Sequence, residues 1–97
     1  MSQQIVDAIR GKRIVEFDYA GHHRIAEPHV YGLHRGVEQL LIYQVAGGSS
    51  SGGLPQWRRV DVPGISGLSI MADVFPGPRP NPSGEHSRWD QIYAIVS

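Results

Sequence analysis

Short runs of alternating apolar and polar residues, separated by turn residues, constrain the fold of this chain most. Val15, Phe17 and Tyr19 alternate with Glu16 and Asp18, and a period of two is typical of a strand with one buried face. Further strands are expected at residues 24–33, 39–45, 56–62, 65–71 and 91–96, the last with a helix as the alternative. Short strands joined by tight turns favour a mainly β fold, a small partly open barrel of about five strands, over a parallel sheet.

The first residues follow a different period. A short N-terminal helix is expected over residues 3–11, with Ser2 as its N-cap and Gly11 as a left-handed stop. Its apolar residues share one face at helical spacing: Ile5, Ala8 and Ile9. A helix this short is not stable alone, so it should pack on the rest of the domain.

Two stretches and one proline interrupt the pattern. Residues 47–53 (GGSSSGG) have almost no side chains to pack and are expected to form a mobile loop. Residues 75–88 are dense in proline and glycine and predict an irregular arm, either a surface connection or an extended segment for a partner's groove. Pro28 falls inside the second strand, which suits an edge strand or a bulge.

Composition narrows the class of protein. The 97 residues suit one domain, residues 1–97, and such small domains often gain stability from a partner or from copies of themselves. The formal net charge is zero, which argues against a non-specific DNA coat, and the lack of cysteine excludes disulfides and thiol chemistry. The first residues lack signal-peptide character and no apolar run approaches a membrane span, so a cytoplasmic protein without membrane contact is expected.

Several motifs occur in a recognisable order: AIRGKRIVEFDY, then RIAEP, EQLLIYQ and RRVD, followed by ISGL. This order, from Ile5 to Leu68, resembles a WYL domain. The tripeptide itself is degenerate, because Glu38-Gln39-Leu40 stands where that family has Trp-Tyr-Leu, and Pro63-Gly64 looks inserted before the last motif.

The resemblance implies an SH3-like, Sm-like barrel that acts as a ligand-sensing module in bacterial transcription regulation. The resemblance favours nucleotides or nucleic acid as the ligands. The positions that match the family's site are Tyr19, Arg24 and Arg59, with Tyr43 as a weaker candidate. Since the chain carries no helix-turn-helix, it is expected to act as a free-standing sensor or through a protein partner.

The chemistry of these residues agrees with an anionic, aromatic ligand. Guanidinium groups bind phosphate bidentately and aromatic rings stack on bases. Strand alternation places Arg59 and Asp61 on one face with Trp57, and Arg58 with Val60 on the other. In the alternative interpretation the arginines pair with carboxylates such as Asp61 and the aromatics are core. Loop contacts are possible at three further positions: Ser49, Ser50 and Ser51.

Other chemistry is less well supported by the sequence. Four histidines within a short span, at positions 22, 23, 29 and 34, are expected to be ordinary surface residues and not zinc ligands. The serines and histidines lack a nucleophile elbow, and the carboxylates of Glu16 and Asp18 are expected to be solvated. The sequence therefore predicts a non-enzymatic binding module without a cofactor. The alternatives are a structural oligomerisation module and a small hydrolase that uses Ser50 and His29.

Overall fold

The computed structural model describes residues 2–48, 53–79 and 89–97. One helix is followed by six antiparallel strands and a 3-10 turn. In chain order they are α1 (Gln3–Arg10), β1 (Arg13–Tyr19), β2 (His22–His34), β3 (Val37–Gly47), β4 (Gln56–Asp61), η1 (Val62–Gly64), β5 (Ser66–Val74) and β6 (Gln91–Ile95). The predicted mainly β class is confirmed, and so is a strand at the C-terminal end.

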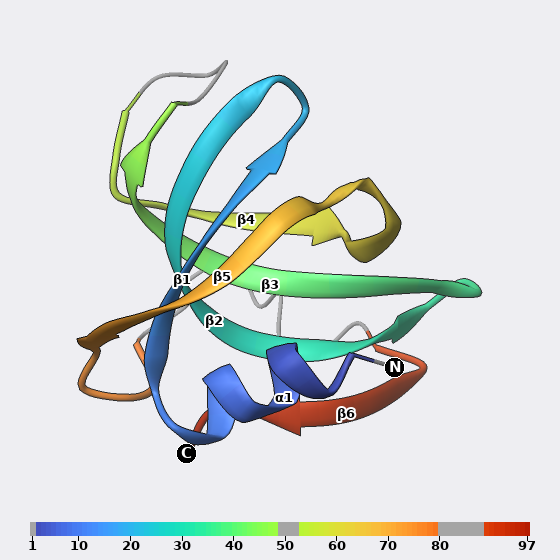
Figure 1. Ribbon diagram of the computed structural model, residues 1–97. Coiled ribbons are helices and arrows are strands. Elements are labelled where there is room, and N and C mark those ends of the chain that lie inside the picture. Colours follow the sequence, from blue (N-terminus) through green and yellow to red (C-terminus); the bar gives the residue numbers. More distant parts are fainter. Residues whose placement is uncertain (1, 49–52, 80–88) are drawn as a thin grey trace.

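The strands form one curved sheet in the order β4-β3-β2-β1-β5, with β6 on β2 (Figure 1). The end strands β4 and β5 do not pair, so the sheet is not closed into a barrel. It curls around a core instead, because Leu68 and Ile70 of β5 pack on the same cluster as the buried residues of β3.

Strand β2 has 13 residues and organises the sheet. It pairs with β3 along most of its length, with β1 through His22–Ala26, and with β6 through Val30–Leu33. A register shift between Pro28 and Val30 separates the two halves. The bulge predicted at Pro28 is therefore confirmed. The alternative of an edge strand is wrong, because β2 has neighbours on both sides.

The N-terminal helix begins as predicted, with the Ser2 side chain accepting a hydrogen bond from the Ile5 N–H at 3.3 Å. Its end differs from the prediction. Gly11 keeps helical geometry (φ −84°), and Lys12 takes the left-handed conformation (φ 53°). The helical hydrogen bonding extends one residue beyond Gly11, since the Lys12 N–H still donates to the Ile9 carbonyl at 3.1 Å.

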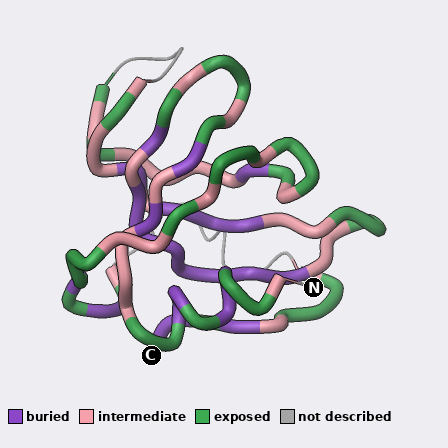
Figure 2. The backbone as a smooth tube through the Cα atoms, viewed as in Figure 1, coloured by how far each residue is buried: buried purple, intermediate pink, exposed green. Residues whose placement is uncertain are grey.

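The core lies between the concave face of the sheet and α1 (Figure 2). Its most deeply buried members include Phe17, Tyr31, Leu40 and Ile42. The helix packs against β1, β2 and β6, at the opposite end of the molecule from the β1–β2 turn (Figure 1). Among the described residues, no helix has the length and apolar character that crossing a membrane requires.

Candidate anion-binding site

On the concave, core-facing side of β2, β3 and β4, the apolar residues give way to polar side chains toward the β1–β2 turn. Strand alternation puts Arg24 on the same face as Ala26, and Ala26 lies opposite Gln44. Gln44 shares its face with Ile42, which lies opposite Arg58. The pairing therefore brings two guanidinium groups and an amide to one face, from β2, β3 and β4.

Arg24 is the most unusual of these residues, because it is a charged side chain only 2% exposed. Its Nε donates to the Tyr19 carbonyl oxygen at 3.2 Å and its Nη1 donates to Oε1 of Gln44 at 3.1 Å. Both acceptors are neutral, and no carboxylate in the described part of the chain pairs with Arg24. Burial and, to a lesser extent, the charge of Arg58 lower the pKa of the Arg24 guanidinium. Among the described residues, the positive charge of Arg24 therefore has no negative counterpart.

Gln44 fixes the position of Arg24. Its side chain is fully buried, and its Nε2 donates to the carbonyl oxygens of Ala46 at 3.1 Å and Gly48 at 2.9 Å. The Gly48 N–H in turn donates to the His23 carbonyl oxygen at 2.8 Å. With its amide nitrogen committed to these carbonyls, Gln44 presents its oxygen to Arg24 and links that residue to the end of β3.

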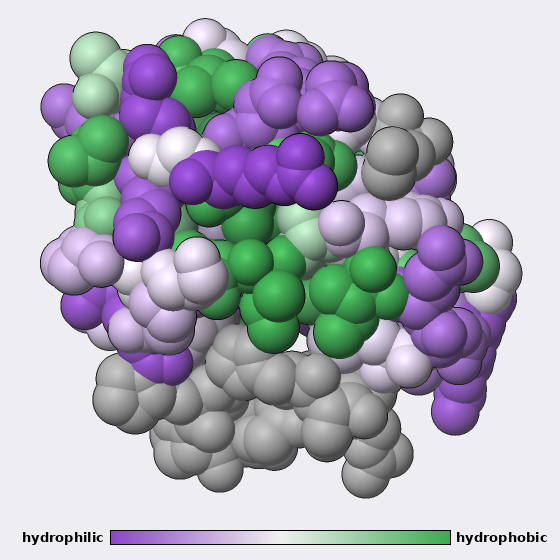
Figure 3. Space-filling view, turned by 90° about the horizontal axis from the view of Figure 1, so that it is seen from below, coloured by the Kyte–Doolittle hydropathy of each residue, from purple (hydrophilic) through white to green (hydrophobic). Residues whose placement is uncertain are grey.

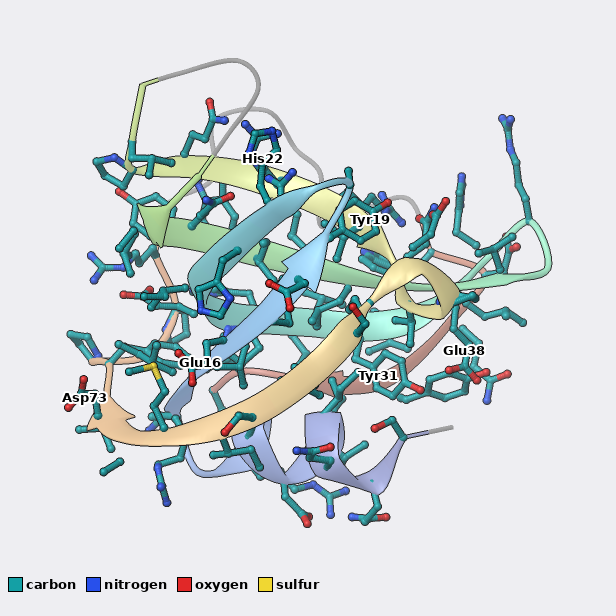
Figure 4. All side chains as sticks on the ribbon, turned by 45° about the horizontal axis from the view of Figure 1, so that its top comes forward. Glu16, Tyr19, His22, Tyr31, Glu38 and Asp73 are labelled. Carbon is teal, nitrogen blue, oxygen red and sulfur yellow. The ribbon has the colours of Figure 1, made fainter. Side chains whose placement is uncertain are left out.

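Tyr19 forms the wall of the site beside Arg24. The centre of its ring is 5.5 Å from the Arg24 guanidinium carbon, and its hydroxyl accepts a hydrogen bond from the Asp61 N–H at 3.1 Å. Gly64 packs so closely that an added Cβ would lie 2.9 Å from the ring. Figure 4 shows Tyr19 and His22 at the end of the molecule away from Tyr31 and Glu38. The ring is therefore held in place at this end.

The other two predicted site residues, Tyr43 and Arg59, lie on the opposite, convex face. The Arg59 Nε donates to Oε1 of Gln39 at 2.8 Å, and its guanidinium lies 3.8 Å from the centre of the Trp89 ring. Tyr43 lies opposite Trp57, with ring centres 5.1 Å apart. The structure thus brings Tyr19 and Arg24 together but does not bring Tyr43 and Arg59 to them.

Alternation along β4 is the physical reason. Arg58 and Arg59 are neighbours, so they must face opposite sides, and Val60 in the core fixes which one faces inward. The predicted division of these faces is confirmed. Gln44 is a member that the sequence prediction missed, because the run at residues 39–45 is apolar on both faces and does not show which face turns inward. The predicted loop contacts Ser49, Ser50 and Ser51 lie outside the described residues.

The histidines differ from the prediction at one position. His29 is completely buried, and its Nε2 lies 3.2 Å from Oε1 of the equally buried Glu27. The expectation of surface histidines is therefore wrong for His29, because β2 buries it between Trp57 and Phe75. Within residues 2–48, 53–79 and 89–97, no three histidine or carboxylate groups are arranged to hold a metal ion.

No family model, curated protein or solved structure gives a significant match to this chain. The resemblance to WYL domains therefore rests on the order of the sequence motifs.

Proposed function

We propose that this chain is a non-enzymatic sensing module, similar to WYL domains, that binds an anionic ligand in bacterial regulation. The ligand class is a nucleotide or a single strand of nucleic acid. The observation that carries the proposal is buried Arg24, whose two hydrogen-bond acceptors are both neutral. Burying a charge is costly unless an opposite charge compensates it, and a phosphate oxygen supplies that compensation.

The neighbouring residues suit the same ligand. Arg58 adds a second guanidinium on the concave face, close enough to lower the pKa of Arg24. The Tyr19 ring offers a surface on which a base stacks, an interaction of about 1–3 kcal/mol per base. Because the whole chain has no net charge, recognition depends on this local site and not on long-range attraction.

Binding reaches the rest of the molecule through Gln44. A ligand phosphate on Arg24 competes with the Gln44 oxygen for the guanidinium, and the same amide holds the carbonyls of Ala46 and Gly48. Occupancy of the site therefore changes the backbone at the end of β3. A protein partner that contacts the end of β3 therefore binds the ligand-bound and ligand-free forms differently.

The experiment is an NMR titration of the labelled protein with inorganic phosphate, adenosine monophosphate and a short oligothymidylate. Arg24→Gln is expected to weaken binding at least tenfold, about 1.4 kcal/mol, and Arg58→Gln to weaken it less. Arg59→Gln is the matched control, because Arg59 lies on the convex face, and it should bind as the unaltered chain does. The proposal fails if no probe shifts the resonances of Arg24 and Tyr19, or if Arg59→Gln weakens binding as much as Arg24→Gln.

A second function, self-association as a structural module, is favoured by the surface around β6. Among the described residues β6 pairs with β2 alone, and its Ile92 and Ile95 are exposed. Figure 3 shows hydrophobic residues gathered in the middle of the face on which α1 and β6 lie. An apolar strand with a free edge pairs readily with a copy of itself.

A further inference from the structure

The convex face holds a second polar site, centred on Glu27. This side chain is only 3% exposed, and its two oxygens accept hydrogen bonds from Nε and Nη2 of Arg79 at 2.6 and 2.7 Å. The contact is a bidentate pairing of carboxylate and guanidinium, the geometry that selects arginine over lysine. His29 completes the floor through its contact with the same Glu27 oxygen.

Aromatic rings form the wall of this site. The Arg79 guanidinium lies 4.9 Å from the centre of the Tyr43 ring, and Tyr43 in turn packs against Trp57. Trp57 meets His29 edge-on, with ring centres 4.8 Å apart. A carboxylate floor and an aromatic wall together provide both the ion pair and the cation–π contact that recognise a guanidinium.

The pocket and its occupant come from different parts of the chain. Glu27, Tyr43 and Trp57 belong to β2, β3 and β4, whereas Arg79 belongs to the segment after β5, which has no regular secondary structure through residue 79. The Arg79 side chain is 37% exposed, in contrast to 3% for Glu27. The sheet therefore supplies the carboxylate and the rings of this site, and the partly exposed Arg79 side chain contacts them from the segment after β5.

We propose that this pocket is an arginine-binding site, filled in cis by Arg79 and able to accept an arginine from another chain in its place. The ligand class is an arginine in a peptide segment without regular secondary structure, the context in which Arg79 follows Pro78. The bidentate pair and the ring contact depend only on the guanidinium, so any accessible arginine reproduces them. The cis residue has the advantage of a high effective concentration, and displacement of the Arg79 side chain opens the site to a partner.

The site lies on the opposite face of the sheet from Arg24, so arginine binding here does not depend on anion binding at Arg24. The test uses Arg79→Ala with N-acetyl-argininamide as the probe and N-acetyl-lysinamide as the control compound. Melting temperature and the indole N–H resonance of Trp57 are measured. The variant should melt below the unaltered protein, and the arginine compound should restore several degrees saturably and shift the Trp57 resonance.

The double variant Glu27→Gln with Arg79→Ala lacks the carboxylate and should show neither response. The inference is overturned if Arg79→Ala responds no more than the double variant, or equally to the lysine compound. If Arg79→Ala does not fold, Arg79→Lys keeps a positive charge beside Glu27 without the planar fork. The arginine compound should then displace the substituted lysine and raise the melting temperature, and the absence of this effect would equally overturn the inference.

Discussion

At the scale of single residues, the two faces of the sheet differ in whether a buried charged side chain has an oppositely charged partner. Glu27 on the convex face is matched by the opposite charge of Arg79. Arg24 on the concave face is matched, in the part of the chain that the structure describes, by neutral oxygens of Tyr19 and Gln44. A buried charge that has its counterpart is satisfied within the fold, whereas one without it gains from an external anion. This difference is the physical basis of our proposal that Arg24 binds an anion.

His23 gives a pH dependence that tests the geometry of the β1–β2 hairpin. Hydrogen bonds to Asp18 at 2.9 Å and then to Glu16 at 3.3 Å raise the pKa of His23 above 6.5. A raised folded-state pKa stabilises the protein fully below the unfolded value, and this contribution is lost as the pH rises through the folded value. An NMR titration between about pH 5 and 8 should find that Asp18→Asn lowers the His23 pKa more than Glu16→Gln does. Equal titration curves in all three proteins would contradict these contacts.

At the opposite end of the molecule, loss of the Tyr31 hydroxyl is expected to lower stability measurably. Its hydroxyl donates to Glu38 and accepts from the Ser2 N–H at 2.7 Å, and burial together with the Glu38 contact raises its pKa to about 12. Tyr31→Phe removes both hydrogen bonds and should lower the free energy of unfolding by about 1–3 kcal/mol. Urea denaturation measures this loss. Tyr93→Phe, at the ring that packs edge-on against Tyr31, is the control, and an equal loss there would contradict the role of the hydroxyl.

At the scale of elements, Gly32 decides whether β6 can pair with β2. A Cβ on Gly32 would lie 2.2 Å from the Gln91 carbonyl oxygen and 2.9 Å from the Trp89 ring, distances that no side chain tolerates. Gly32→Ala should therefore separate β6 from β2 and speed amide hydrogen exchange in β6. Gly53→Ala has nothing within 4 Å of the new Cβ and should leave exchange unchanged. Similar exchange in the two variants would show that β6 does not depend on this approach.

The alternation of short runs predicted most of the strands because it requires only local sequence. It did not predict where β2 lies in the sheet, since Pro28 is compatible with an edge or with a bulge. The run at residues 39–45 is apolar on both faces, so its inward face cannot be chosen before its partners are known. For this reason Gln44 was missed. Arg24 and Arg59 were assigned to one site because both match motif positions of the family that the sequence resembles.

The Glu27–Arg79 pair was beyond sequence reasoning for a similar cause. The two residues are 52 positions apart, and nothing local links a strand carboxylate to an arginine among prolines. Distant pairs of this kind become visible only when the chain's path after β5 is known. Local sequence patterns therefore predict the helix and strands, whereas the sites depend on tertiary contacts that these patterns do not reveal.

At the scale of the whole molecule, exposed isoleucines on β6 predict self-association. Ile95 is 52% exposed on this strand, and Val74 on β5 is 65% exposed. Ile95→Lys should convert a concentration-dependent oligomer to a monomer in light scattering, because it places a charge on β6, the strand proposed to pair with its copy. Val74→Lys tests whether any exposed apolar residue has this effect, and it should not alter the mass. A mass that Ile95→Lys leaves unchanged would rule out the β6 edge.

Strand β2 is hydrogen-bonded to β1, β3 and β6, so half of the sheet's strands have it as a neighbour. None of them can detach from β2 without exposing a row of unpaired backbone groups. The hydrogen bonds of β2 are for that reason expected to open only when the whole protein unfolds. The backbone amides of β2 should therefore show the slowest hydrogen exchange in the protein.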